Sequence, residues 1–551
     1  MSGLPGSAHL LALPILLPLA TAALLLGVGE GRRRLKAGVS VLAMLVNLGV
    51  AVVLMASVQD GASVHAISVY LPGNWPVPFG IVLALDRLSA IMLLLAACAA
   101  LASLLFSLAR WHRASVHFHP LLQLQLMGLN GAFLTADLFN LFVFFEVLLA
   151  ASYGLLLHGG GATRVRPGLH YIAINLVASL LFLIGVALLY GVTGTLNMAD
   201  IAQKLPHVPE GDRGLLHAGA AVLAVAFLAK AAFWPLNFWL PAAYSAASAP
   251  SAALFAILTK VGVYSVLRLW TLCFPASAGE SALFGSPVLV WGGIATLAFA
   301  AVGMLASQQL GRLAGYSIIA SSGTVLAAIG MDEPRLTAGA LFYMASSTLA
   351  AAALFLLVEL VERPRQVEVD PPGDELEGRL PMFADAPPPD VNLDDQEVAL
   401  VGRAIPAALA YLATTFLLCM LVLAGLPPLS GFVGKLAMLA ALVEGGGGSV
   451  PAARWWLFGL LILSGLAAAI ALVRAFIAHF WAVQERPQPV LRVIEVLPVT
   501  LLLAACVALV FQAEAAMAYT RQTAATLHTP TAYIGAIFNA LPVGWPRREG
   551  Q

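Results

Sequence analysis

The sequence predicts an all-α polytopic membrane protein with about fourteen transmembrane helices. Of its 551 residues, 60% are hydrophobic and only 10% are charged, whereas soluble domains carry roughly 25% charged residues. The mean hydropathy is +0.91. The apolar residues also form long runs, and about 20 such residues are enough to cross a bilayer. These observations together exclude an ordinary soluble enzyme.

Apolar runs separated by helix breakers define the predicted spans. They fall near residues 9–28, 38–57, 83–108, 118–136, 138–157, 169–190, 215–233, 250–273, 287–306, 310–330, 338–361, 405–444, 455–482 and 493–513. No basic residue precedes the first run, so we expect a permanent helix there and not a cleaved signal peptide.

Prolines interrupt two of these runs. Pro235 follows the seventh run, and Pro427 and Pro428 lie in the middle of the twelfth run, which is too long for one crossing. Proline removes a backbone donor and clashes with the preceding turn. We therefore expect the seventh and twelfth helices to be broken. Interrupted helices in corresponding halves of a chain are typical of transporter sites between inverted repeats.

The distribution of Lys and Arg predicts the orientation, because these residues concentrate in cytoplasmic loops. The odd-numbered loops are rich in them, with Arg32, Arg33, Arg34, Lys36, Arg110, Arg113, Arg164, Arg166, Arg312, Arg363, Arg365, Arg379, Arg403, Arg486 and Arg492. The even-numbered loops hold only Lys204, Arg213, Arg335 and Arg454. We therefore expect both termini on the outer side of the membrane.

Residues 362–402 form the one long polar insert, rich in Asp, Glu and Pro. Such a segment cannot bury enough apolar surface to fold alone, which predicts a cytoplasmic linker. The four cysteines are widely spaced in apolar runs and form no metal or redox pattern; they are Cys98, Cys273, Cys419 and Cys506. We expect no metal, no cofactor and no nucleic-acid partner.

Four ionisable residues lie in the middle of predicted helices: Glu146, Lys230, Lys260 and Lys435. Charge is costly inside a membrane, so such residues usually mark an ion pathway. Burial favours the neutral form of a lysine, and a nearby carboxylate favours its charged form. Movement of Glu146 relative to Lys230 would then load or release a proton. The alternative is a static ion pair between these two residues that fixes helix packing.

Other charged residues give weaker signals. Asp137 stands where an acidic residue favours a helix N-terminus, and Asp86 is expected to cap a helix or pair with Arg87. Arg268 and Arg474 lie toward helix ends and are expected to snorkel. Glu359 lies near the cytoplasmic end of its span. We regard Asp137, Arg268 and Glu359 as auxiliary candidates. Three histidines cluster in one short cytoplasmic loop: His112, His117 and His119. We expect this loop to leave them in solvent, and the alternative is a metal site.

Four segments resemble the antiporter-like subunits of respiratory complex I and of Mrp cation/proton antiporters. They are residues 130–146 (NGAFLTADLFNLFVFFE), 230–241 (KAAFWPLNFWLP), 249–251 (APS) and 426–432 (LPPLSGF). The resemblance spans roughly residues 80–480. Around Glu146 the sequence is most similar to the D-type subunits of Mrp (Pha/Mnh) antiporters. The acidic insert looks longer than the family's usual connection. The tail after residue 513 is too short for the lateral helix of the largest complex I subunit.

The resemblance implies two inverted five-helix repeats. These would cover residues 118–273 (helices 4–8) and 287–482 (helices 9–13), preceded by helices 1–3 in residues 1–117 and followed by helix 14 and the tail in residues 493–551. It also implies that Glu146 and Lys230 form a coupled pair, that Lys260 is the central relay, and that Lys435 is the distal lysine.

The function expected from these observations is proton translocation within a multisubunit Na⁺ or K⁺/H⁺ antiporter in the cell (inner) membrane. Its partners would be the other subunits, the exchanged ions and membrane lipid. The alternative is a proton-pumping membrane subunit of a redox complex, either an NADH–quinone oxidoreductase or a membrane hydrogenase. The sequence holds no Walker-A motif and no cysteine cluster for iron–sulfur, so ATP hydrolysis or electron transfer by this chain alone is not expected.

Overall fold

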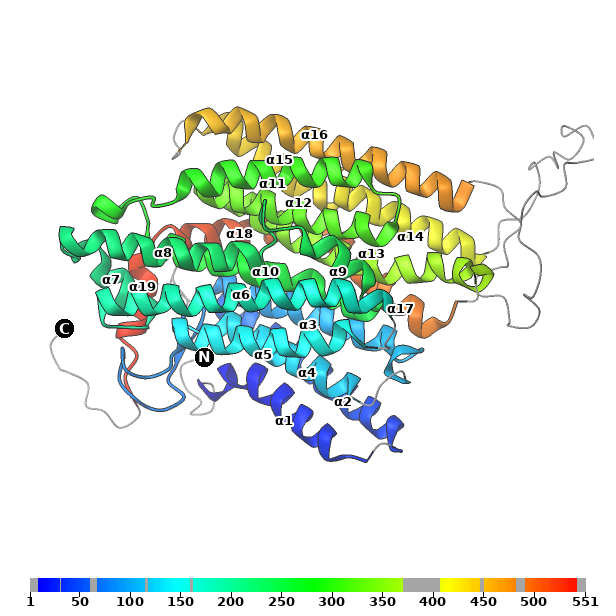
Figure 1. The fold of residues 1–551 in the computed structure, drawn as a ribbon, viewed down its shortest axis with the longest axis horizontal. Helices are drawn as coiled ribbons and strands as arrows, with labels where there is room; N and C mark the ends of the chain where they lie inside the picture. Colours follow the sequence, from blue (N-terminus) through cyan, green and yellow to red (C-terminus); the bar gives the residue numbers. More distant parts are fainter. Residues whose placement is uncertain are drawn as a thin grey trace, which may run out of the picture.

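A computed structural model describes residues 8–29, 31–59, 67–113, 117–158, 162–369, 407–445, 450–481 and 491–542. It confirms the predicted helical membrane architecture (Figure 1). The fourteen predicted spans overlap in order with α1 (Leu13–Gly27), α2 (Arg33–Gln59), α3 (Arg87–Ser107), α4 (Phe118–Leu134), α5 (Leu138–Leu156), α6 (Ala162–Thr193), α8 (Glu210–Lys230), α10 (Ala249–Cys273), α11 (Ser286–Ala306), α12 (Leu310–Gly330), α13 (Pro334–Val369), α14 (Ala407–Ala424), α16 (Pro451–Phe476) and α17 (Val493–Phe511). The twelfth span, 405–444, covers both α14 and α15 (Ser430–Glu444).

Within the described residues, 12 helices are long and apolar enough to cross a membrane, and α1 and α4 are shorter. The helices run alongside one another, with α1 along one edge of the bundle and α16 along the opposite edge (Figure 1). The central helix α10 is buried along its whole length, and α12 and α13 nearly so. These three helices carry many Ser and Thr side chains in an otherwise apolar core.

Both predicted helix breaks are present. The helix α8 ends at Lys230, and the short α9 (Trp239–Ala246) follows after a non-helical stretch that contains Pro235. Likewise α14 ends at Ala424, and α15 (Ser430–Glu444) begins after Pro427 and Pro428. Each break therefore places backbone polar groups and a helix end inside the bundle, next to one of the predicted lysines.

The predicted linker begins later than expected. The helix α13 continues to Val369, so the first eight residues of the 362–402 segment are helical. Glu362, Arg363, Arg365 and Gln366 are good helix formers, and extending an existing helix costs little compared with starting one. The helix therefore continues past Pro364, which lacks a backbone N–H. Residues 370–402 lie outside the described part of the chain.

One end of the bundle carries short elements that the sequence did not reveal (Figure 1). The strands β1 (Ser68–Tyr70) and β2 (Leu83–Leu85) pair antiparallel, with Val69 opposite Ala84. The helix α7 (Met198–Lys204) precedes α8. The expected C-terminal tail instead forms α18 (Ala513–Leu527) and α19 (Pro530–Phe538). The helix α18 packs against α13.

Candidate functional site

Glu146 and Lys230 are brought together through a third residue, Ser179. They lie on α5, α8 and α6, respectively. The Lys230 ammonium donates to the Ser179 hydroxyl oxygen over 3.2 Å, and that hydroxyl donates to Glu146 Oε1. One serine hydroxyl thus accepts from the cation and donates to the carboxylate. The two charges form a bridged pair and not a direct ion pair.

The end of α8 provides a favourable place for the Lys230 cation. Lys230 is the last residue of this helix, where the helix dipole favours positive charge. Its ammonium also lies 5.0 Å from the centre of the Phe145 ring, within the range of a cation–π interaction. The indole of Trp239 donates to the carbonyl of Ala229 over 3.3 Å, which also accepts from the Ala232 backbone over 3.2 Å. Backbone donors and the Trp239 side chain therefore together satisfy the carbonyls at the end of the broken helix.

Glu146 is less enclosed than the sequence predicted. It is half-buried, and its neighbours on the same face of α5, Val143 and Ala150, are exposed. By contrast, Lys230 is 4% exposed. The carboxylate therefore lies at the outer edge of the bundle, and the lysine lies inside it.

Lys260 occupies the centre of the buried helix α10 and is 1% exposed. Its ammonium donates to the Ser322 hydroxyl of α12 over 3.1 Å and to the Ile318 carbonyl over 3.5 Å. The helices α8 and α10 approach closely nearby, since a Cβ atom on Gly262 would lie only 2.7 Å from the Ala231 nitrogen. Lys260 therefore stands one helix further into the bundle than Lys230.

Two serine pairs join α12, α13 and the second broken helix. Ser321 of α12 and Ser347 of α13 lie 2.7 Å apart at their hydroxyl oxygens. Ser346 of α13 and Ser430, the first residue of α15, also lie 2.7 Å apart. Neighbouring serines in the chain thus face different helices. The pairs form polar contacts across α12, α13 and α15, all buried.

Lys435 stands beside the second helix break. Its ammonium donates over 2.9 Å to the carbonyl of Ala424, the last residue of α14, and lies 5.8 Å from the Tyr343 ring centre. The side chain passes directly over Gly425, which has a positive φ of 73°. A Cβ atom at this glycine would collide with Lys435 Cδ. As at Lys230, a lysine meets the C-terminus of an interrupted helix.

The auxiliary acids have defined structural roles. Asp137 is the N-cap of α5, where its carboxylate accepts from the Asn140 backbone over 2.8 Å, as the sequence predicted. Glu359 accepts from the Trp111 indole over 2.6 Å and from Arg363 over 3.0 Å. Arg363 also lies 2.9 Å from Glu495, which is 1% exposed.

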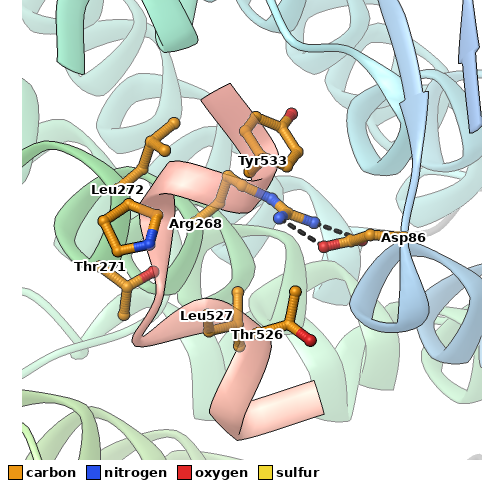
Figure 2. Close-up of a pocket in the computed structure, with 8 residues that line it drawn as sticks. Asp86, Arg268, Thr271, Leu272, Thr526, Leu527 and Tyr533 are labelled. Atoms are coloured by element: carbon orange, nitrogen blue, oxygen red, sulfur yellow. Dashed lines mark hydrogen bonds and ion pairs between the residues drawn. The ribbon is translucent and has the colours of Figure 1, made fainter. Parts of the chain in front are cut away.

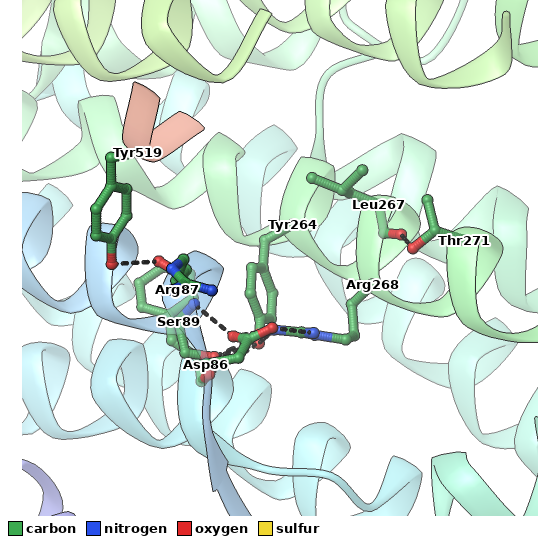
Figure 3. A network of polar contacts seen from close by, with 9 residues as sticks. Asp86, Arg87, Ser89, Tyr264, Leu267, Arg268, Thr271 and Tyr519 are labelled. Carbon is green, nitrogen blue, oxygen red and sulfur yellow. Dashed lines mark hydrogen bonds and ion pairs between the residues drawn. The ribbon is translucent and has the colours of Figure 1, made fainter. Parts of the chain in front are cut away.

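Arg268 does not snorkel, contrary to the prediction. It is 4% exposed and forms two parallel hydrogen bonds of 2.6 Å with Asp86 (Figure 2). Asp86 also accepts from the Ser89 backbone and so caps α3 as expected, but its charged partner is Arg268 on α10 and not the adjacent Arg87 (Figure 3). The two residues are 182 positions apart, so no local pattern could pair them.

Two further expectations are corrected. His119 is not solvated: it lies in the first turn of α4 and is 3% exposed, because α4 begins at Phe118 and this helix packs against α1, α3 and α5. Arg474 is directed at protein and not at an interface, since it donates to the Ser307 carbonyl over 2.6 Å. This carbonyl lies just past the C-terminus of α11, where a cation is favoured.

The chain is similar to known antiporter proteins over nearly its whole length. The family model described as "NADH:quinone oxidoreductase/Mrp antiporter, TM" matches residues 135–384. A probable K⁺/H⁺ antiporter D-type subunit of Rhizobium meliloti is 52% identical over 541 residues, covering 97% of this chain and 98% of the relative. The chain belongs to the family of D-type Mrp antiporter subunits. A D-type Na⁺/H⁺ antiporter subunit of Alkalihalophilus pseudofirmus is 33% identical, covering 96% of this chain and 99% of that one.

Solved structures confirm the fold of this Mrp antiporter family member. A chain of the Mrp complex from Dietzia superposes with a TM-score of 0.78 at 24% identity, covering 96% of this chain and all of that one. A chain of respiratory complex I from Thermus thermophilus gives 0.71 at 23% identity, with the same coverage of this chain and all of the other. The chain is thus a multi-pass membrane protein of the complex I-like antiporter fold.

Sequence reasoning missed two residues that belong to the buried polar row of this antiporter protein: Ser179 and Ser430. Single serines in apolar helices are common and usually bond to their own helix, so their types alone carry no signal. The helix face on which each serine lies would identify its partner only if the neighbouring helices were known. Within the described residues, no group of three or more His, Cys, Asp or Glu side chains is placed to hold a metal.

Proposed function

We propose that this chain translocates protons as one subunit of a multisubunit monovalent cation/proton antiporter. The observation that carries the proposal is the row of four ionisable residues inside the bundle, each resting on a hydroxyl or a helix end. Buried ionisable residues are expensive in a membrane and typical of proton pathways. The curated relatives named as antiporter subunits match nearly the whole chain, which favours this function over a redox-coupled pump.

The proposed route begins at the half-buried Glu146 and passes through the Ser179 hydroxyl to Lys230. It continues to Lys260 on the neighbouring helix α10. From there the Ser322 hydroxyl and the two serine pairs of α12, α13 and α15 lead to Lys435. Protonation of one lysine disfavours protonation of the next through like-charge repulsion, so a proton arriving at one end promotes release at the other.

We propose K⁺ as the cation exchanged by the complex. The 52% identical relative is named for K⁺/H⁺ exchange, whereas the relatives named for Na⁺/H⁺ exchange are 33% identical. The complex would lie in the cell (inner) membrane with both termini of this chain outside, following the Lys and Arg distribution of its loops. The partners would be the other subunits of the antiporter.

The test uses inverted membrane vesicles from an antiporter-deficient strain that expresses the complete complex. Addition of K⁺ or Na⁺ to energised vesicles reports exchange as a loss of the pH gradient. Glu146→Gln, Lys230→Ala, Lys260→Ala and Lys435→Ala are each expected to abolish exchange while the subunits still co-purify. Lys204→Ala is the matched control, because Lys204 pairs with Asp200 outside the row. Full exchange in an assembled row variant would refute the route, and a response to Na⁺ alone would refute K⁺.

A further inference from the structure

A second set of buried polar side chains lies between α2 and α4, away from the charged row. We call it the α2–α4 polar file; it consists of Lys36, Ser40 and Asn47 on α2 and His119, Gln123 and Asn130 on α4. None is more than 5% exposed. On each helix the three residues follow the same spacing of four and then seven positions. At 3.6 residues per turn, this spacing keeps them on one face.

Hydrogen bonds join the two helices at matching levels of the file. The Gln123 amide nitrogen donates to the Ser40 hydroxyl over 3.1 Å and to its carbonyl over 3.3 Å. Further along, the Asn130 amide nitrogen donates to Asn47 Oδ1 over 3.4 Å. Both contacts join residues 83 positions apart, and the same separation aligns Lys36 with His119. The file therefore has three levels and extends for about 16 Å along α4.

The helix α1 completes the file at the Asn130 level. Pro18 lies inside α1 and has no backbone N–H, so the Pro14 carbonyl lacks its usual helical donor. The Asn130 and Asn47 amides donate to this carbonyl over 2.7 Å and 3.3 Å. The carbonyl that the proline of α1 leaves without a helical donor is thus satisfied by asparagines from α2 and α4. Because a carbonyl only accepts, the Asn130 nitrogen must face it and the Asn130 oxygen must point elsewhere in the file.

Each level on α4 holds polar atoms without a protein partner. Gln123 Oε1, Asn130 Oδ1 and both ring nitrogens of His119 are fully buried and make no hydrogen bond within the described structure. Leaving such groups unsatisfied costs about 1–3 kcal/mol each. Buried polar atoms of this kind are normally satisfied by ordered water. The unpaired atoms recur along the file, so they call for several waters and not for one.

The file is separated from the charged row by α4 itself. Gly128 and Gly131 of α4 face α5, the helix that carries Glu146, because a Cβ atom at either would collide with Leu148 or Phe144. Gln123 faces α2 instead. The file contains no carboxylate, and the ionisable groups near its His119 end are Lys36, His112 and His158. Amides, a hydroxyl, a histidine and a buried lysine without an acid suit water better than a bound metal cation.

We propose that the α2–α4 polar file holds ordered water and forms a second proton path, separated by α4 from the Glu146–Lys435 row, and that full exchange requires both. Water molecules joined by amide and hydroxyl groups would pass protons along the file between the His119 and Asn130 levels. This goes beyond the proposed exchange function, because it assigns a path to N-terminal helices that carry no residue of the row.

Water in the file is tested by X-ray hydroxyl-radical footprinting of the assembled complex in detergent. Radicals formed from bound water oxidise adjacent methionines. Met44 lies on α2 between the Ser40 and Asn47 levels and is 1% exposed, and Met92 on α3 is a matched control at 0% exposed. We expect Met44 to be oxidised at least fivefold faster than Met92. Equal, slow oxidation of the two would overturn the proposal.

The proton path is tested with Gln123→Leu, which removes the middle level while keeping a similar volume. Leu126→Met is the matched control on the same helix, and co-purification of the partner subunits reports folding. We expect Gln123→Leu to lower Met44 oxidation to the Met92 rate and to lower cation-dependent proton exchange at least threefold. Loss of Met44 oxidation with normal exchange would overturn the path. If Gln123→Leu fails to assemble, Ser40→Ala replaces it and is expected to lower both Met44 oxidation and cation-dependent proton exchange. No change in these two measurements would overturn the proposal.

Discussion

The ammonium group of Lys230 lies 3.2 Å from the hydroxyl oxygen of Ser179, and this contact replaces a direct ion pair with Glu146. The serine hydroxyl can rotate, so it can accept from the lysine ammonium and donate to the carboxylate, or accept from the protonated carboxyl group and donate to the neutral lysine amine. A static ion pair that only fixed helix packing would not need such a bridge. The arrangement therefore favours a proton-carrying role over a purely structural one.

Replacing Ser179 with alanine should slow exchange without removing any charge. The variant Ser179→Ala breaks both hydrogen bonds of the bridge. Hydrogen bonds to charged groups contribute about 1.5–3 kcal/mol, so we expect at least a roughly tenfold lower initial rate of cation-dependent proton exchange. The rate is measured in inverted vesicles that contain equal amounts of assembled complex.

Ser179→Thr keeps the hydroxyl and serves as the matched variant, since threonine adds only one methyl group. It should retain most of the exchange rate. Equal losses in both variants would show that packing near α6, and not the hydroxyl, is what matters.

Whether a feature can be predicted from the sequence depends on how far apart in the chain its interacting residues lie. Helix spans and both breaks could be predicted, because apolar run length and proline act locally along the chain. The buried lysines Lys230 and Lys435 could also be identified from the sequence, because a charged residue within an apolar run is unusual. The contacts of Asp86 could not be predicted, because its partner Arg268 is 182 positions away. Nor could the burial of His119, which depends on how α4 packs on neighbouring helices.

Gly425 should be required for the position of Lys435. The variant Gly425→Ala introduces a Cβ atom that would overlap Lys435 Cδ, at a φ of 73°, a backbone conformation that favours glycine. The lysine must then leave its contact with the Ala424 carbonyl. We expect exchange to fall toward the level of Lys435→Ala, although every charge of the row is retained.

The matched control is Gly459→Ala on α16, where an added Cβ atom meets nothing within 4 Å. Exchange by this variant should remain normal. If Gly425→Ala also exchanged normally in an assembled complex, Lys435 would not need its present position.

Arg363 should stabilise the end of the bundle where α13 meets α17. Its guanidinium lies 3.0 Å from Glu359 and 2.9 Å from Glu495. Arg363→Ala leaves the buried Glu495 without this partner, which typically costs about 3–5 kcal/mol. We expect a lower thermal unfolding midpoint for the purified complex and weaker assembly. The double variant Arg363→Ala with Glu495→Gln should recover part of the loss; no recovery would indicate that the arginine acts through other contacts.

The Asp86–Arg268 pair should also be a stabilising element, and its loss should be separable from loss of transport. Asp86→Ala leaves the Arg268 guanidinium buried and unpaired against Tyr264 and Tyr533, whose ring centres lie 5.4 Å and 4.9 Å away. Breaking one side of a buried pair costs about 3–5 kcal/mol, whereas replacing both partners with apolar residues is often tolerated.

We therefore expect Asp86→Ala to lower the thermal unfolding midpoint of the purified complex strongly. The double variant Asp86→Leu with Arg268→Met should regain most of that stability. Exchange normalised to assembled complex then distinguishes two roles. If the double variant is stable and exchanges normally, the pair only holds α3 to α10. If it is stable but inactive, the charges themselves take part in transport, and Arg268 would have to be added to the row of Glu146, Lys230, Lys260 and Lys435.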